Sequence, residues 1–139
     1  ERLLLSPGAR ELLEAAQNAG LRTAILSGGF TYFTERLRIE LGFDFATSNE
    51  LEISGGKLTG RVVGDIVDAA AKAHHLVRLT DELGLRKEQV IACGDGANDL
   101  LMMVQAGLSV AFHAKPATRA KADVAINFGG LDSLLNLFD

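Results

Sequence analysis

The stretch IACGDGANDLL, residues 91–101, is where an apolar run of this sequence ends abruptly in glycine and acidic residues. The run from Val90 to Cys93 predicts a short buried strand, and the residues after the turn predict a helix. Between them lie three polar side chains, Asp95, Asn98 and Asp99. An acidic residue is favoured at the start of a helix, so Asp95 can be a simple cap. The alternative is that the turn gathers these groups around a ligand, and the turn alone leaves both hypotheses open.

Outward from this turn, helix-like and strand-like runs alternate along the chain and are separated mostly by glycines. Helices are predicted at 7–19, 30–41, 65 or 68–83, 97–106 and 131–138, and strands at 23–26, 43–48, 90–93, 108–112 and 124–126. This alternation predicts a single α/β domain over 1–139, with a Rossmann-like, mostly parallel sheet and helices on both faces. The segment 51–63 departs from the rhythm. Gly55 and Gly56 separate two strand-like runs there, which predicts a β-hairpin.

The composition excludes several classes of protein. The 139 residues carry a net charge of −4 and show no basic stripe, which argues against nucleic acid as a partner. No apolar run reaches the length of a membrane span, so no membrane partner is expected. The single cysteine, Cys93, rules out a disulfide within the chain and fits a reducing compartment. The expected location is therefore the cytoplasm.

Two predicted turns each follow a parallel strand, so both lie at the carboxyl ends of the strands. Parallel α/β sheets bind their ligands there. One is the turn at 94–99. The other is SGGF at 27–30, where Gly28 and Gly29 allow backbone N–H groups to approach a ligand and Ser27 adds a hydroxyl. With the positive end of the following helix, such a turn can hold an anion such as phosphate. A plain tight turn is the competing interpretation.

A phosphate on this edge would face two carboxylates, Asp95 and Asp99, and would be repelled by both. A hard divalent cation with oxygen ligands resolves this, and Mg²⁺ is the expected one. Asn98 can donate a hydrogen bond to a phosphate oxygen without adding charge. Lys72, near the start of the long helix and so on the same edge, is the candidate counter-charge to the phosphate. The alternative for Lys72 is a solvated surface lysine.

Three stretches in this order resemble the haloacid dehalogenase superfamily of phosphatases: the SGG turn at 27–29, Lys72, and GDGAND at 94–99. The longer runs NELEISGGKLTG, GDIVDAAAKA, GDGANDLLMM and HAKP look like the phosphoserine phosphatases within that superfamily. The resemblance spans nearly the whole chain. It implies a haloacid dehalogenase-like core, with the hairpin at 51–63 as a small flap beside the site, and a small phosphorylated substrate, phosphoserine.

The resemblance also implies a role for each matching residue. Asp95 would bind Mg²⁺ directly, and Asp99 would act in catalysis by supporting the ion from nearby or orienting its water. The phosphate would be held by Ser27, the backbone of Gly28, Asn98 and Lys72. Lys72 would also be a catalytic residue, because it would neutralise the phosphate.

One part of the superfamily pattern is absent from this sequence. These phosphatases attack phosphorus with an aspartate from a DxDxT-type motif on the first strand, and no DxD occurs here. Asp65 and Asp68 are three positions apart at a helix start and are poor substitutes. The resemblance therefore implies that the nucleophile, the first strand and the groups that read the serine lie upstream of Glu1, in a segment of the same protein. That strand would sit between the strands ending at Leu26 and Cys93.

Two consequences follow from the missing motif. The chain alone is expected to be inactive, because an aspartyl-phosphate step needs its nucleophile. Its sheet is expected to have a gap of one strand, to be completed by another chain or a separate piece, or else to be rearranged.

The favoured function is a Mg²⁺-dependent phosphoserine phosphatase that acts through an aspartyl-phosphate in the last step of serine biosynthesis. The alternatives are another phosphatase or phosphotransferase of the superfamily, or a catalytically dead domain that binds phosphate or metal for regulation. A homodimer is compatible with the sequence.

The other reactive side chains are given no catalytic role. His74 and His75 are adjacent on the long helix and cannot both face the site. His113 is expected to make a loop hydrogen bond, and Cys93 to be an inert thiol on a buried strand. Met102 and Met103 are expected to pack in the core.

Overall fold

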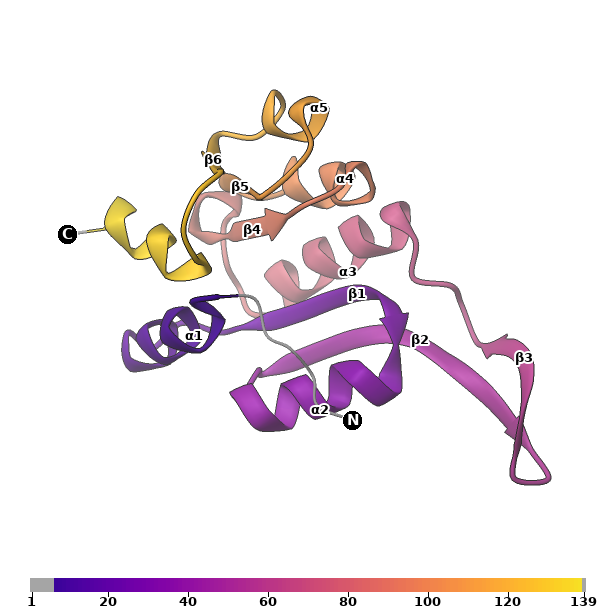
Figure 1. Cartoon of the computed structure of the whole chain (residues 1–139). Coiled ribbons are helices and arrows are strands. Elements are labelled where there is room, and N and C mark those ends of the chain that lie inside the picture. Colours follow the sequence, from indigo (N-terminus) through magenta and orange to yellow (C-terminus); the bar gives the residue numbers. More distant parts are fainter. Residues whose placement is uncertain (1–6, 139) are drawn as a thin grey trace.

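The computed structural model describes residues 7–138, which form an α/β fold with parallel strands and helices, as the sequence predicts (Figure 1). The longer elements are α1 (Ala9–Asn18), β1 (Ala24–Phe30), α2 (Thr31–Leu41), β2 (Phe45–Ser54), β3 (Lys57–Val63) and α3 (Ala69–Glu82). The second half contains η1 (Lys87–Gln89), β4 (Ile91–Gly94), η2 (Ala97–Asp99), α4 (Leu100–Met103), β5 (Leu108–Phe112), α5 (Pro116–Arg119), β6 (Val124–Ile126) and η3 (Leu131–Leu137). Within residues 7–138, no helix has the combined length and apolar character that crossing a bilayer requires.

The described strands form two three-stranded sheets rather than one. In the first, β1 pairs in parallel with β2, and β2 pairs antiparallel with β3. In the second, β4, β5 and β6 are all parallel. Within the described residues β1 and β4 are therefore not direct neighbours, which agrees with the expectation that the two strands do not pair with each other.

Helix α3 lies between the two sheets (Figure 1). It contacts β1 of the first sheet and η2 and α4 of the second. The β2–β3 hairpin projects away from the rest of the chain (Figure 1). Its turn confirms the glycine signal, since Gly55 and Gly56 both have positive φ values, 58° and 77°, which favour glycine.

The main core cluster includes residues of the second sheet and of α4. Its buried members are Ala92, Met102, Met103, Ala106 and Ala111, and Leu26 and Leu76 pack against it. The two methionines are therefore core residues, as expected. Because Leu26 belongs to β1 and Leu76 to α3, this cluster joins both sheets and the long helix through apolar contact.

Several predicted boundaries are wrong, and the reasons are local. The first helix begins at Ala9 rather than at Pro7, because Gly8 has a φ of 79° that no α-helix accommodates. Its expected cap, Ser6, lies outside the described residues. The segment predicted as a helix at 97–106 is a 3₁₀ turn followed by the short α4, and the last helix is of the 3₁₀ type. The short elements η1 and α5 were not predicted.

The largest difference concerns the SGGF segment, which was expected to break a strand ending at Leu26. Strand β1 instead continues through Ser27, Gly28 and Gly29 to Phe30. Its pairing with β2 is irregular there, because the register shifts between Leu26 and Phe30. The segment is thus an irregular end of a strand and not a tight turn.

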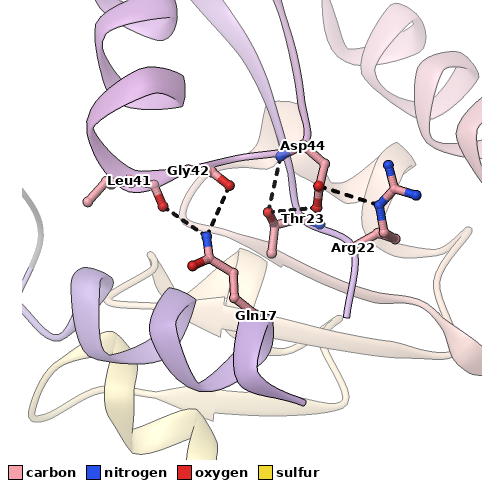
Figure 2. Close-up of polar contacts among 6 residues, drawn as sticks. All are labelled: Gln17, Arg22, Thr23, Leu41, Gly42 and Asp44. Carbon is pink, nitrogen blue, oxygen red and sulfur yellow. Dashed lines mark hydrogen bonds and ion pairs between the residues drawn. The ribbon is translucent and has the colours of Figure 1, made fainter. Parts of the chain in front are cut away.

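The amino ends of the parallel strands are tied together by aspartates. Figure 2 shows Asp44, just before β2, accepting hydrogen bonds from the backbone N–H (2.8 Å) and the hydroxyl (3.3 Å) of Thr23, just before β1. The arrangement recurs in the second sheet, where Asp123 accepts from the N–H (2.8 Å) and hydroxyl (2.9 Å) of Ser109. These bonds from Ser109 lower the pKa of Asp123. We call the two pairs hydroxyl–aspartate clasps.

A side-chain amide fastens α1 to the end of α2 on the same edge (Figure 2). Gln17 donates hydrogen bonds to the carbonyl oxygens of Leu41, at 3.1 Å, and Gly42, at 3.0 Å. Gly42 has a φ of 75° and ends α2 where the sequence predicts. The side chain thereby satisfies carbonyl groups that the end of a helix leaves without intrahelical partners.

Candidate functional site

The GDGAND turn is built on a buried ion pair. The ammonium nitrogen of Lys72 lies 2.8 Å from Oδ1 of Asp99, and the two residues are only 6% and 7% exposed. The other carboxylate oxygen of Asp99 accepts weaker bonds from the backbone N–H groups of Asp95, at 3.2 Å, and Gly96, at 3.3 Å. Both oxygens of the carboxylate are therefore bound, which is the condition for burying a charge.

Gly94 is needed for this arrangement. A Cβ built on Gly94 would lie 2.5 Å from Cβ of Asp99 and 2.8 Å from its carboxyl carbon. No pair of side chains tolerates such a distance, so only glycine lets the strand end directly against the Asp99 side chain. The abrupt change from apolar residues to glycine in the sequence has this steric cause.

Asp95 and Asn98 have the opposite character to Asp99. Both are exposed, and within the described part of the chain neither side chain has a hydrogen-bond or ion-pair partner. Gly96 is the residue at the cap position of η2, and its backbone N–H is bound by the side chain of Asp99 and not by that of Asp95. The hypothesis that Asp95 is merely a helix cap is therefore wrong, since its side chain makes no capping bond.

Lys72 is not the solvated lysine of the alternative interpretation. It lies in the first turn of α3, whose N-cap Asp68 accepts a hydrogen bond from the N–H of Ala71 at 2.9 Å. That cap begins the helix, so Lys72 is one turn in and reaches the GDGAND turn. The structure thus brings Lys72 and Asp99, two of the predicted site residues, into direct contact.

The second predicted turn ends β1 of the other sheet. The hydroxyl oxygen of Ser27 accepts a hydrogen bond from the N–H of Gly29 at 2.9 Å, which leaves the hydroxyl hydrogen free to donate elsewhere. The carbonyl oxygen of Gly28 accepts from the side chain of Asn49 at 2.9 Å. Asn49 was not predicted as a site residue. No local pattern marks it, because Asn49 falls between the predicted strand at 43–48 and the predicted hairpin at 51–63.

The two turns are connected through the start of α3. The side chain of Asn49 that binds Gly28 also accepts a hydrogen bond from the backbone N–H of Val67, at 2.7 Å. Val67 lies two residues before the first helical residue of α3, which carries Lys72 to Asp99. A continuous set of hydrogen bonds and covalent chain therefore links the SGG segment with the GDGAND turn.

The residues present could hold a magnesium ion only together with ligands that are not protein side chains. Within residues 7–138, no three His, Cys, Asp or Glu side chains gather closely enough to hold a metal ion by themselves. Mg²⁺ characteristically uses one or two carboxylates together with water and phosphate oxygens. Asp99 is engaged by Lys72 and by the turn, so Asp95, exposed and without a partner among the described residues, is the carboxylate with open oxygens.

The remaining reactive side chains lie apart from this chemistry. The ring of His113 hydrogen-bonds to the carbonyl oxygen of Gly129 at 2.8 Å, which confirms the expected loop contact. Cys93 is exposed, so the expectation of a buried residue is wrong. Neighbouring atoms nevertheless crowd its sulfur, and this desolvation raises the pKa of the thiol to about 11. A thiol that stays protonated at neutral pH is a poor nucleophile.

Two surface hollows do not contain any predicted site residue. One, of about 540 Å³, lies between α2, β2 and α3 and is lined in part by Arg38, His75 and Arg78. The other, of about 450 Å³, lies on the edge of the second sheet and includes Lys87 and Asp123. The predicted site residues on the two strands instead lie at or just beyond the carboxyl ends of β1 and β4, where ligands generally bind in α/β sheets.

Comparison with known proteins places the chain in a family. The model of the haloacid dehalogenase-like hydrolases matches residues 1–104. Phosphoserine phosphatase from Polaromonas sp. strain JS666 is 55% identical over 140 residues, which cover 98% of this chain and 59% of that protein. Phosphoserine phosphatase from Haemophilus influenzae is 51% identical over 137 residues, covering 99% of this chain and 44% of that protein.

Solved structures agree with the sequence relatives. An unliganded probable phosphoserine phosphatase from Vibrio cholerae superposes with a TM-score of 0.92 at 47% identity, covering 96% of this chain and 41% of that chain. A substrate-bound phosphoserine phosphatase complex gives a TM-score of 0.90 at 37% identity, over 96% of this chain and 64% of that one. The chain thus spans three-fifths or less of the length of the two curated relatives described here. The match of the family model to residues 1–104, which is most of the chain, shows that the chain belongs to the haloacid dehalogenase-like hydrolase family.

Proposed function

We propose that this chain forms the phosphate- and metal-binding part of a Mg²⁺-dependent phosphoserine phosphatase, which converts O-phospho-L-serine and water to L-serine and phosphate. The observation that carries the proposal is a turn that joins a buried Lys72–Asp99 pair to two exposed side chains without partners in the described chain, Asp95 and Asn98. Its relatives of about 50% identity, all described as phosphoserine phosphatases, support the choice of substrate.

Four groups would hold the phosphate. Ser27 keeps a hydroxyl hydrogen to donate, because its oxygen already accepts from Gly29. Asn98 offers an exposed amide donor, Gly28 has no side chain to keep a phosphate from its backbone, and Lys72 supplies positive charge. A cation that is held in place and shielded from water stabilises charge that develops on phosphoryl oxygens more effectively than a solvated one.

Asp95 would hold Mg²⁺ through its open carboxylate. The ion, when bound, would offset the repulsion between the negatively charged phosphate and the carboxylates on this edge. Asp99 would act from beneath the site, because its carboxylate orients the backbone of Asp95 and fixes Lys72. In this proposal Asp99 holds the turn and Lys72, in addition to the support of the ion or its water that the resemblance implies.

The nucleophile would be a carboxylate outside this chain, in an upstream segment of the same protein. One similar solved structure, at 37% identity and a TM-score of 0.91, is described as a phospho-aspartyl intermediate analogue of phosphoserine phosphatase. By analogy, a carboxylate oxygen would bond to phosphorus as the bond between phosphorus and the serine oxygen breaks. The departing serine oxygen would take a proton from a second aspartate, also outside this chain. Water would then attack the phosphoryl group, returning the proton and releasing phosphate. The step belongs to serine biosynthesis in the cytoplasm.

The experiment is a substrate panel on the full protein that contains this chain, with and without Mg²⁺. Phosphoserine, phosphothreonine and several sugar phosphates are compared by phosphate release. The proposal expects kcat/KM for phosphoserine to exceed the others by at least about tenfold and to vanish with a chelator. A preference for another phosphomonoester would favour the related phosphatases. No hydrolysis of any of them, with phosphate still bound, would favour a regulatory domain.

The upstream nucleophile has its own test. The purified segment 1–139 is expected to release no phosphate from phosphoserine above background. Adding the upstream segment as a separate polypeptide is expected to restore Mg²⁺-dependent release. Turnover by 1–139 alone would show that a nucleophile lies within these residues and that the proposed mechanism is wrong.

A further inference from the structure

Asn49 is a buried amide that none of the proposed chemistry uses directly. It is 6% exposed and lies on β2, opposite the end of β1. Its Nδ2 donates to the carbonyl oxygen of Gly28 at 2.9 Å, and its Oδ1 accepts from the N–H of Val67 at 2.7 Å. A buried amide that satisfies two backbone groups from different segments fixes those segments relative to each other.

The contact with Gly28 falls where the regular strand pairing fails. Residues 24–26 of β1 pair in register with residues 45–47 of β2, and pairing then resumes only at Phe30 and Asn49. In the irregular interval, the side chain of Asn49 supplies a donor to the Gly28 carbonyl. A side chain thus stands in for a strand–strand hydrogen bond at the segment that is proposed to hold phosphate.

The peptide group between Gly28 and Gly29 is held at both ends. Its carbonyl oxygen is bound by Asn49, and its N–H is bound by the hydroxyl oxygen of Ser27. Two glycines in sequence would otherwise leave this peptide free to rotate, because neither residue has a side chain that restricts φ and ψ. The orientation of the Ser27 hydroxyl therefore depends on a peptide that Asn49 holds.

The second bond of Asn49 reaches the segment that leads into α3. Val67 is itself buried, at 6% exposed, and precedes the helix whose first turn carries Lys72. Through one amide, the phosphate-binding serine on one sheet is fixed relative to the lysine that reaches the other sheet. Apolar contacts could hold these segments close together. They are not directional, however, so they could not fix the orientation of the Gly28–Gly29 peptide group.

We propose that Asn49 is a positioning residue that sets the Ser27–Gly29 segment against the start of α3, so that Ser27 and Lys72 meet one phosphate group. The inference rests on the proposed function, since it needs a phosphate at this edge. Asn49 itself does not touch the substrate in this account. It acts through Ser27, and that dependence can be measured.

The test is a double-mutant cycle in the full protein that contains this chain. Asn49→Asp keeps the size of the side chain and an acceptor for Val67, but it places an oxygen against the Gly28 carbonyl. Ser27→Ala removes the hydroxyl that Asn49 is proposed to position. Each single variant is expected to lower kcat by about 10- to 100-fold, since small misplacements of phosphate-binding groups have effects of this size. The double variant is expected to lie within about threefold of the worse single variant, because both changes remove the same interaction.

Gln17→Ala is the matched control. Gln17 is also an amide that binds two backbone groups, but it lies on α1 near Thr23 and Asp44, which precede β1 and β2 (Figure 2). This variant is expected to lower the melting temperature while leaving kcat unchanged, and to combine additively with Ser27→Ala. If Asn49→Asp does not fold, Asn49→Ser takes its place in the same cycle.

Binding of inorganic phosphate, measured by calorimetry on the same variants, separates this inference from the proposed function. Weakened phosphate binding in Asn49→Asp, with no further loss on adding Ser27→Ala, supports the inference even if phosphoserine is not the substrate. Additive effects of the two changes on kcat and on phosphate binding would overturn it, as would an Asn49 variant that behaves like Gln17→Ala. A parent protein that binds phosphate but does not hydrolyse phosphoserine would count against the proposed function alone.

Discussion

The two ends of the parallel strands use the same kinds of residue in opposite ways. At the amino ends, Thr23 with Asp44 and Ser109 with Asp123 form the hydroxyl–aspartate clasps, in which each acid is bound by a hydroxyl and a backbone N–H. At the carboxyl ends, Asp95 is exposed and has no side-chain partner within residues 7–138. An aspartate in a clasp stabilises neighbouring strands, whereas an aspartate with open oxygens can bind a ligand.

The carboxyl edge nevertheless has one acid, Asp99, whose two carboxylate oxygens are both bound, but its partner differs from those in the clasps. Asp99 is paired with a buried lysine, whereas the cation beside Asp44, Arg22 at 3.5 Å, is exposed. A buried ion pair is a weak source of stability, because desolvation of both charges offsets their attraction. The clasps join strands without burying a pair of charges, so they avoid this desolvation cost. The charged pair at the carboxyl edge therefore makes more sense as a means of holding Lys72 and the GDGAND turn in place for a ligand.

The largest expected effect is on the exposed acid. Asp95→Asn in the full protein is expected to abolish Mg²⁺-dependent activity, because one charged oxygen ligand is lost from a site with few protein ligands. The melting temperature is expected to stay close to that of the parent, since Asp95 has no side-chain partner in the described chain. Initial rates over a Mg²⁺ titration and a thermal melt measure both. Unchanged turnover at limiting Mg²⁺ would remove Asp95 from the metal site.

The next effect combines activity and stability. Lys72→Met keeps most of the side-chain volume but leaves Asp99 buried without its cation, which typically costs about 3–5 kcal/mol. Turnover is expected to fall by about two orders of magnitude or more, since a positive charge near the phosphoryl group is lost. Urea unfolding and kcat are measured on the same preparation. A variant that keeps activity within a few-fold of the parent would show that Lys72 is a structural residue only.

The clasp is expected to show a loss of stability without a loss of activity. Asp44→Ala removes the acceptor for the N–H and hydroxyl of Thr23, and because these hydrogen bonds are exposed to solvent, the loss is expected to cost about 0.5–1.5 kcal/mol. The value of kcat for phosphoserine is expected to be unchanged, because the clasp lies at the opposite ends of the strands. A large drop in kcat with little change in unfolding would contradict the division between the two edges.

The smallest effect is a pH dependence in the second clasp. Hydrogen bonds from Ser109 lower the pKa of Asp123 below its ordinary value of 3.8. A lowered folded-state pKa contributes stability that is present above pH 3.8 and is lost as the pH falls through the folded value. The difference in melting temperature between parent and Asp123→Asn is therefore expected to be constant from pH 7 to 5 and to shrink below pH 4. Asp81→Asn, on an exposed helix position, is the control. A difference that grows on acidification would have the wrong sign.

The sequence predicted those features that depend on neighbouring residues. Strands β5 and β6 have the predicted bounds, and the hairpin at Gly55 and Gly56 and the end of α2 at Gly42 lie where glycine requires them. Each of these features depends on an apolar run or on a backbone conformation that favours glycine. Both kinds of signal can be recognised from a few consecutive residues.

The features that the sequence did not predict depend on distant residues. The burial of Lys72 comes from Asp99, which is 27 positions away, so a lysine on a helix carries no local sign of it. Strand β1 continues past Leu26 in part because Asn49 on another strand binds Gly28. The irregular shape of the SGG segment and the amide that supports it could therefore not be predicted from local patterns, although Ser27 and Gly28 themselves were predicted as site residues.

The most direct test of the central claim is to map where phosphate and Mg²⁺ act on the folded protein. Backbone amide signals of the isotope-labelled full protein are followed by NMR as inorganic phosphate and then Mg²⁺ are added. The account predicts the largest shifts at the carboxyl edge, in Ser27, Gly28, Asp95 and Asn98, with the clasp residues nearly unchanged. The shifts from Mg²⁺ should disappear in Asp95→Asn. Shifts centred on the clasps, or on neither edge, would contradict the assignment of the carboxyl edge as the functional site.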